Sequence, residues 1–142
     1  MAGPLSNAQT ITKLPAQDLD RARAFYRDKL GLEPVEERVG GLRYLLGTSE
    51  FHVFSSSGAA SGTSTQMGFE VEDLEATLAD LRERGVAFER FDMPGFGAAG
   101  DTIAAPDNYP SKGTGELGAF FYDSEGNLLG LAQPVRDELD AA

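Results

Sequence analysis

The sequence predicts an α+β fold built from two copies of a βαβββ module. The first observation is an internal repeat, because the segment LPAQDLD at residues 14–20 is echoed 55 positions later by FEVEDLE at residues 69–75. The second is that each copy reads as a strand running into an amphipathic helix, followed by short strand-like segments separated by glycine. The third is the length of 142 residues, which suits one domain or two small halves that share a core.

The two expected helices have matching ends. Asp18 and Asp73 are placed to accept hydrogen bonds from exposed backbone N–H groups, and Gly31 and Gly85 are placed to end each helix. Apolar residues recur at helical spacing between these ends: Leu19, Ala22, Tyr26 and Leu30 in the first helix, and Leu74, Leu78 and Leu81 in the second. We therefore expect each helix to cover one side of a sheet.

Segments of strand character follow each helix. In the first half they are residues 33–38, 42–46 and 51–55, and in the second half residues 86–91, about 102–104, 118–123 and 128–132. Gly40-Gly41 and Glu125-Gly126-Asn127 are typical hairpin turns.

The chain is expected to form a single domain over residues 1–142. Module one covers about residues 9–57, a Ser/Gly/Ala-rich linker about 58–64 and module two about 65–135, and Arg136 to Ala142 form a short solvated tail.

Residues 92–117 interrupt this pattern. The 26-residue interval holds five glycines and three prolines, and at most one short strand is expected in it. Long irregular segments of compact domains are usually functional or disordered. A lid over a pocket and a mobile surface insertion are therefore both open interpretations.

The composition excludes several classes of protein. Twelve Lys and Arg against 23 Asp and Glu give a net charge of −11, so a nucleic-acid partner is not expected. The absence of cysteine excludes disulfide frameworks and thiolate-bound metals. No apolar run reaches the length of a membrane span, and the first ten residues do not resemble a signal peptide, so we expect a cytoplasmic protein with no membrane partner.

Two motifs in order make the chain similar to a known group. They are LPAQDLDRA at residues 14–22, with Phe25-Tyr26 and Leu30-Gly31-Leu32 after it, and DSEGNLL at residues 123–129. Over about residues 9–135 the chain resembles the vicinal oxygen chelate superfamily, the glyoxalase, bleomycin-resistance and extradiol-dioxygenase group. The resemblance implies that the two modules form one eight-stranded open cup, with the helices outside and a ligand within. It also implies that dimers are common and that enzymatic members hold one divalent metal in the cup.

Strand alternation indicates which side chains face the cup. Side chains two apart share a face, so the apolar positions must face the core and their neighbours the cup. The expected core positions are Phe51, Val53, Met67, Phe69, Val71, Leu129 and Leu131. The expected cup positions are Glu50, His52, Phe54, Gln66, Gly68, Glu70 and Gly130. Alternation leaves open the facing of Arg43, and whether Phe121 or the pair Phe120 and Tyr122 faces the cup.

The metal positions implied by the resemblance fall on Ile11, His52, Gln66 and Gly130. Only His52 has a side chain that is a good metal ligand, and a divalent ion generally needs three or more protein ligands. We therefore expect no metal, no cofactor and no catalytic residue. A carboxylate site that borrows Glu50 and Glu70 is the alternative.

The expected ligand-binding residues line the cup or the long loop: Lys13, His52, Phe54, Gln66, Tyr109, Phe120 and Tyr122. The aromatic members are suited to a flat apolar molecule. Lys13 is suited to an anionic group of a ligand, or else to a structural ion pair with Glu70. His52 is read either as a pocket-lining residue or as a general base.

The leading functional hypothesis is a metal-independent protein that binds a small aromatic or apolar molecule in the cup, similar to the antibiotic-sequestering members of the superfamily, and forms a homodimer. The alternative is a metal-dependent or acid–base enzyme of the same superfamily, a lyase, isomerase or dioxygenase. A third hypothesis is an accessory domain without a ligand, and retained polar groups on the cup face argue against it.

Overall fold

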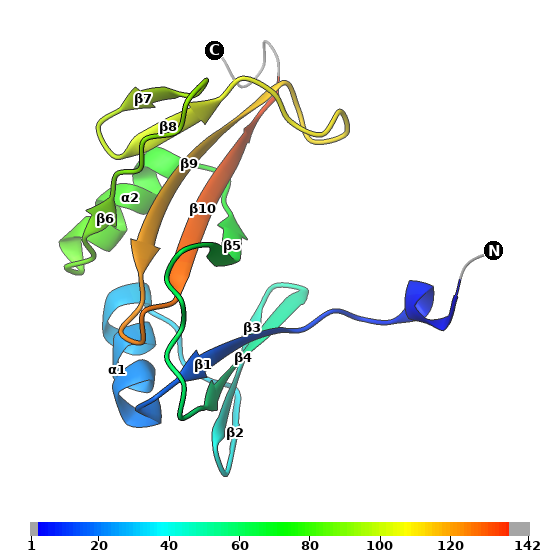
Figure 1. The fold of residues 1–142 in the computed structure, drawn as a ribbon, viewed down its shortest axis with the longest axis vertical. Helices are drawn as coiled ribbons and strands as arrows, with labels where there is room; N and C mark the ends of the chain where they lie inside the picture. Colours follow the sequence, from blue (N-terminus) through cyan, green and yellow to red (C-terminus); the bar gives the residue numbers. More distant parts are fainter. Residues whose placement is uncertain (1–2, 137–142) are drawn as a thin grey trace.

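The computed structural model describes residues 3–136 (Figure 1). A short 3-10 helix, η1 (Pro4–Asn7), precedes the first module. That module contains β1 (Thr12–Ala16), α1 (Leu19–Leu30), β2 (Glu36–Arg38), β3 (Gly41–Leu46) and β4 (Ser49–Ser55). The second contains β5 (Thr65–Glu70), α2 (Leu74–Glu83), β6 (Phe88–Glu89), β7 (Gly97–Ala99), β8 (Thr102–Ala105), β9 (Gly115–Tyr122) and β10 (Leu128–Val135).

Each module forms its own mixed sheet. The first sheet has the order β1-β4-β3-β2, and the second has the order β5-β10-β9-β8-β7 with β6 also paired to β9. In both sheets the first strand of the module runs parallel to its last strand. The sheets follow one another along the long axis of the molecule, with the helices on one side (Figure 1). We call the side of each sheet away from the helices its open face.

The helix ends follow the sequence as expected. Asp18 accepts a hydrogen bond from the Arg21 backbone N–H at 3.0 Å, and Asp73 accepts one from the Ala76 N–H at 3.0 Å. Gly31 ends α1 in the left-handed conformation with φ of 70°, which glycine adopts without steric cost. Both caps satisfy N–H groups that a helix leaves without internal partners.

One apolar core joins the two modules on the helix side of the sheets. Tyr44 and Phe51 stack with ring centroids 4.7 Å apart, and Phe51 meets Phe69 of the second module edge to face at 6.3 Å. The predicted core positions are buried or packed against this core, which confirms the alternation. Phe121 is fully buried, so Phe120 and Tyr122 lie on the open face.

Charged groups of the closing turn also tie the modules together. Glu125 accepts hydrogen bonds from the Arg21 guanidinium at 2.8 and 2.9 Å and from the Asp18 backbone N–H at 3.0 Å. The turn between β9 and β10 is thereby attached to the start of α1. The Arg21 contact, more than any other, lowers the pKa of Glu125 to about 2.

The α+β class, the two modules and the position of the helices are confirmed, while the strands differ in number and grouping. The described residues contain ten strands in two sheets rather than eight in one continuous cup. Of the expected strand at 86–91 only β6 forms. β6 pairs with one part of β9 and β8 with the preceding part, and residues 90–101 lie between the two strands. The expected strand at 33–38 keeps only β2, whereas β9 and β10 extend beyond their expected ends.

The interval 92–117 is more ordered than expected. It holds the β7–β8 hairpin and the start of β9. Residues 92–96 before the hairpin, the turn at 100–101 and residues 106–114 between β8 and β9 lack strand or helix. Asp101 in the hairpin turn binds Arg82 of α2 at 2.8 Å and Arg90 at 2.9 Å. These ion pairs connect the hairpin to Arg82 of the helix layer and to Arg90 after β6. The lid and the mobile insertion both stay predictions.

Two further expectations concern the chain as a whole. Neither described helix is long and apolar enough to cross a membrane. The division into one domain with a linker at about 58–64 stays a prediction. Most of the expected solvated tail, residues 137–142, lies outside the described residues.

Candidate functional site

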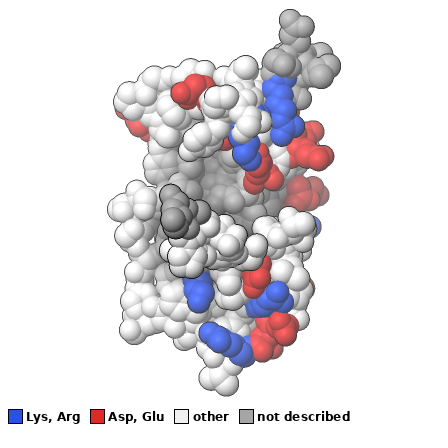
Figure 2. Space-filling model, turned by 90° about the vertical axis from the view of Figure 1, so that its right-hand side faces the viewer, with Lys and Arg blue, Asp and Glu red and all other residues white. Residues whose placement is uncertain are grey.

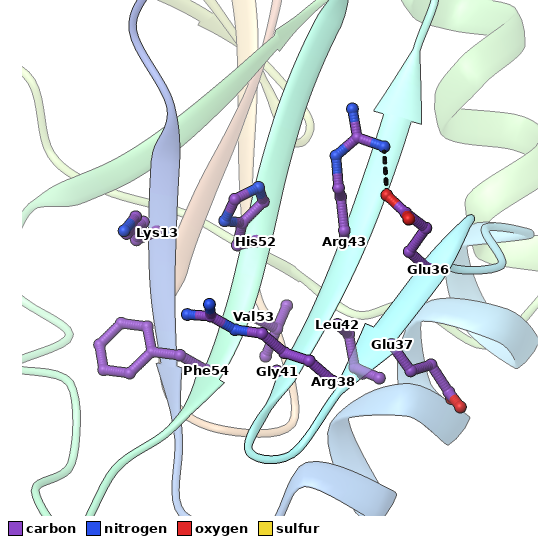
Figure 3. A pocket seen from close by; sticks show the side chains of 10 residues that line it. All are labelled: Lys13, Glu36, Glu37, Arg38, Gly41, Leu42, Arg43, His52, Val53 and Phe54. Atoms are coloured by element: carbon purple, nitrogen blue, oxygen red, sulfur yellow. Dashed lines mark hydrogen bonds and ion pairs between the residues drawn. The ribbon is translucent and has the colours of Figure 1, made fainter.

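Two cavities lie on the open faces, one on each sheet. The first-sheet cavity has a volume of about 560 Å³. The polar and aromatic side chains that line it include Lys13, Glu36, Arg38, Arg43, His52 and Phe54 (Figure 3). The second-sheet cavity has a volume of about 260 Å³, and the residues that define it here are Gly68, Met93, Phe96, Ile103, Phe120 and Gly130. The two differ in chemistry, because half of the residues that line the first are charged, whereas the second is lined mainly by apolar ones.

The polar side chains of the first-sheet cavity form a row across four strands. His52 of β4 is in register with Lys13 of β1 on one side and with Arg43 of β3 on the other. Arg43 is in turn in register with Glu36 of β2. Neighbouring strands lie about 4.8 Å apart, so each side chain in the row is within reach of the next. This register settles the facing of Arg43, which sequence alternation left open.

Glu50 binds two members of this row. Its Oε2 accepts hydrogen bonds from Arg43 Nε at 2.7 Å and from His52 Nε2 at 2.6 Å. Arg43 above all, and then His52, lower the pKa of Glu50 to about 2, so this carboxylate is ionised at neutral pH. An ionised carboxylate only accepts hydrogen bonds, so His52 donates through Nε2 and, when neutral, presents Nδ1 as an acceptor.

Lys13 and Arg38 differ from Arg43, because neither forms an ion pair within residues 3–136. The expected bridge from Lys13 to Glu70 is wrong. Glu70 instead binds Nζ of Lys112 at 2.8 Å. Lys112 lies in the segment between β8 and β9. Figure 2 shows Lys and Arg atoms over the lower, four-stranded sheet of this face, with carboxylates beside them.

Glycines of three neighbouring strands form the base of the second-sheet cavity, which we call its floor. Gly68 of β5 and Gly130 of β10 are in register with one another, and Gly118 of β9 lies near them on the same face. A Cβ added at Gly68 would meet only the Gly130 carbonyl oxygen, at 3.9 Å. Apolar side chains stand around this floor, among them Phe120, whose ring packs edge to face on Phe91 at 5.5 Å. A Cβ added at Gly130 would instead lie 3.4 Å from both the Phe120 ring and the Thr65 methyl group, so these side chains cover Gly130. The part of the surface that stays open is the one over Gly68.

The structure divides the expected ligand-binding residues between several places. Lys13, His52 and Phe54 line the first-sheet cavity, and Phe120 lines the second. The other three line neither cavity. Gln66 has a buried Oε1 without a hydrogen-bond partner within residues 3–136, Tyr109 is 77% exposed, and the Tyr122 hydroxyl donates to the Gly62 carbonyl at 2.8 Å. A ligand role for all seven stays a prediction.

Sequence reasoning placed Phe96 of the long interval near the cup but missed Arg38, Met93 and Ile103. Arg38 lies on the short edge strand β2, where no alternation was available to orient it. Met93, Phe96 and Ile103 reach the second-sheet cavity because the interval 92–117 folds back against β9. The feature of the sequence that could have indicated a special role for Arg38 is Gly41, which lies directly across the hairpin from it.

The residues present do not fit the divalent metal that enzymatic relatives hold. Of the four implied positions, His52 lies on the first sheet, Gln66 and Gly130 lie on the second, and Ile11 has no donor atom. The alternative carboxylates are engaged elsewhere, Glu50 by Arg43 and Glu70 by Lys112. No three His, Asp or Glu side chains in residues 3–136 are grouped so that they would hold a metal ion. The site rebuilt from Glu50, His52, Gln66 and Glu70 is therefore not assembled within this chain.

Comparison with known proteins agrees with this architecture. The chain matches the model of the glyoxalase/bleomycin resistance protein/dioxygenase superfamily over residues 9–131. A search of curated proteins gave no significant match.

Solved structures with the same fold cover almost the whole chain. A glyoxalase/bleomycin resistance protein/dioxygenase from Alicyclobacillus acidocaldarius is 19% identical with a TM-score of 0.66, covering 98% of each chain. A bleomycin-binding protein complexed with bleomycin is 23% identical with a TM-score of 0.62, covering 89% of this chain and 98% of that one. An antibiotic binding protein from Streptomyces is 23% identical with a TM-score of 0.57, covering 90% and 96%. At these identities the likeness shows the fold alone.

Proposed function

The chain belongs to the glyoxalase/bleomycin resistance protein/dioxygenase superfamily, and on that premise we propose that it is a metal-independent protein that binds a small aromatic molecule on its open faces. The observation that carries this proposal is the open surface over Gly68, beside Phe120 and Phe96, where an added Cβ would meet only a carbonyl oxygen at 3.9 Å. Apolar surface that folding leaves unburied costs free energy, at roughly 25 cal/mol per Å². A planar guest on this floor would recover that free energy.

The chemistry of the two cavities supports binding more than metal-assisted catalysis. Apolar walls with few polar groups bind flat molecules by contact area and stacking. The donor atoms that a metal enzyme of this superfamily uses are missing or engaged in ion pairs, as described above. The bleomycin-binding protein of the same fold was solved with its antibiotic, so the fold is compatible with holding a small molecule.

A metal-free acid–base enzyme is the second candidate, and one contact favours it. His52 is hydrogen-bonded to the ionised Glu50 at 2.6 Å and lies next to Lys13 on β1. A carboxylate that orients an imidazole is the arrangement that general bases use. In this candidate His52 would remove a proton from an enolisable substrate, and Lys13 would stabilise the negative charge that develops.

We also propose a homodimer, as first inferred from the sequence. Several large apolar side chains are exposed, among them Leu5 at 84% and Val39 at 104%. Leu5 lies in the N-terminal segment that projects from the body of the molecule (Figure 1). Light scattering coupled to size-exclusion chromatography would test the dimer, and a cytoplasmic location stays a prediction from the sequence.

The two functional candidates are separated by a ligand screen followed by a turnover assay. A set of planar aromatic compounds is screened by thermal shift, and each hit is incubated with the protein and followed by mass spectrometry. Binding without conversion, retained in His52→Ala, is expected. Conversion of a hit that His52→Ala abolishes would establish the enzyme instead. The absence of any hit would contradict the binding function.

A further inference from the structure

The first-sheet cavity contains two cations that no carboxylate of the described chain neutralises. Arg43 is held by Glu50 and Glu36, and the remaining acid of the cavity, Glu37, is bound to Arg23 of α1. Lys13 and Arg38 form no ion pair within residues 3–136. The whole chain carries a net charge of −11, so unpaired cations on one small surface are unusual here.

The position of Arg38 depends on the absence of a side chain at Gly41. It lies opposite Gly41 in the β2–β3 hairpin. A Cβ at residue 41 would lie 3.3 Å from Arg38 Cγ and 3.4 Å from its Nε, so the arginine occupies space that any other residue would restrict. Figure 3 shows its guanidinium reaching past Gly41 toward β4.

Lys13 and Phe54 complete the surroundings of this guanidinium. Gly41 is in register with Phe54 on β4, and Lys13 is in register with His52 two residues before Phe54. The Phe54 ring is 37% exposed on this open face. Two cations without an ion pair in residues 3–136 therefore lie beside an accessible aromatic ring.

We propose that the first-sheet cavity recognises an oxyanion carried by an aromatic ring. Arg38 and Lys13 bind the anion, a carboxylate, phenolate or phosphate, and Phe54 packs against the ring that carries it. A guanidinium offers paired N–H donors that match such oxyanions, and an ammonium adds a point charge. This inference rests on the proposed binding function and specifies the class of its ligand as an anionic aromatic compound.

The experiment compares two probes of nearly identical shape. Isothermal titration or ligand-observed NMR at neutral pH measures binding of 2-naphthoate and of neutral 2-naphthamide. 2-Naphthyl phosphate is the second anion, and 2-naphthol, which is uncharged at this pH, is a second neutral probe. The wild-type protein is compared with Lys13→Met/Arg38→Met and with a control, Arg27→Met/Lys29→Met. The control removes the same charge from α1 and leaves the open face intact. Thermal melts verify that each variant folds.

Wild type is expected to bind at least one of the anions about tenfold more tightly than the amide, and the preference should weaken as salt rises. The Lys13→Met/Arg38→Met variant should lose the preference, and the control should keep it. Gly41→Val displaces Arg38 without removing its charge and should reduce the preference partly.

Three results would overturn the inference. Equal binding of the amide and of both anions would do so while leaving the proposed function in place. A preference retained by Lys13→Met/Arg38→Met, or lost equally in the control, would place the anion elsewhere. Failure of every aromatic compound in the screen to bind would overturn the proposed function together with this inference.

Discussion

The hydroxyl of Tyr26 donates a 2.7 Å hydrogen bond to the carboxylate of Asp123, which joins the first helix to the closing turn of the second module. Both residues are buried, and Asp123 also accepts hydrogen bonds from the Asn127 side chain at 2.8 Å and from the backbone N–H of Glu125 at 2.8 Å. The pKa of Tyr26 is raised well above its usual value, first by burial and then by Asp123. The phenol therefore stays protonated and keeps its donor role.

Replacement of this hydroxyl is expected to destabilise the protein. Tyr26→Phe leaves the buried Asp123 with one donor fewer, and loss of a partner to a buried charged group costs about 1–3 kcal/mol. The free energy of unfolding in urea measures the effect. Tyr44→Phe is the matched control, because the Tyr44 hydroxyl is also buried and has no hydrogen-bond partner within residues 3–136. The control should be neutral or stabilising, and equal losses in the two variants would contradict this account.

Stability is expected to fall in acid through Glu125. Its pKa is about 2 in the folded protein and near 4.5 in the unfolded chain, so its contribution is complete above about pH 4.5 and is lost as pH falls toward 2. Its side chain is fully buried, and the shift corresponds to roughly 3 kcal/mol. Glu125→Gln should flatten the dependence of unfolding free energy on pH in that window.

The control for Glu125 is an exposed pair of the same type. Asp28 binds Arg27 at 2.8 Å, but both side chains are more than half exposed. Exposed ion pairs contribute little to stability. Asp28→Asn should therefore leave the acid unfolding profile close to wild type, and a change as large as that of Glu125→Gln would count against the cross-module contact as the cause.

Filling the floor of the second-sheet cavity should separate binding from folding. Gly68→Val places a side chain where the nearest atom is 3.9 Å from the new Cβ, and β-branched residues favour strands. The melting temperature should stay the same or rise, while aromatic hits lose about tenfold or more in affinity. Gly58→Val, in the segment between β4 and β5, is the control and should bind as wild type does. Unchanged binding by Gly68→Val would exclude this cavity as the site.

The β7–β8 hairpin is expected to depend on Asp101. Arg82 and Arg90 lower the pKa of Asp101, Arg82 having the larger effect, so the carboxylate stays ionised. Asp101→Ala should raise amide hydrogen exchange at residues 97–105 and change global stability by about 1 kcal/mol or less. Asp80→Ala removes another exposed ion pair, the one between Asp80 of α2 and Arg84 directly after the helix. This variant should not alter exchange in the hairpin. Identical exchange in both variants would show that the hairpin is held by other contacts.

Metal should not affect the protein. The donor atoms at the implied metal positions are dispersed over both sheets, so we expect equal melting temperatures with a chelator and with added Mn, Fe, Ni or Zn. Elemental analysis of the freshly purified protein is the companion measurement. A stoichiometric metal, or a melting shift of several degrees with one ion, would show that ligands from outside the described chain complete a site.

The sequence alone determined the parts of this protein that depend on local physics. Asp18, Asp73 and Gly31 marked the helix ends because capping needs only the adjacent backbone. Alternation placed Phe51, Val53 and Leu129 in the core because successive strand side chains point to opposite faces. Only the tertiary structure decided which polar groups meet, since Glu50 with Arg43 and Glu70 with Lys112 depend on strand register and on the path of residues 106–114. It also decided that Lys13 and Arg38 share a cavity, because their proximity follows from the pairing of four strands and from the space above Gly41.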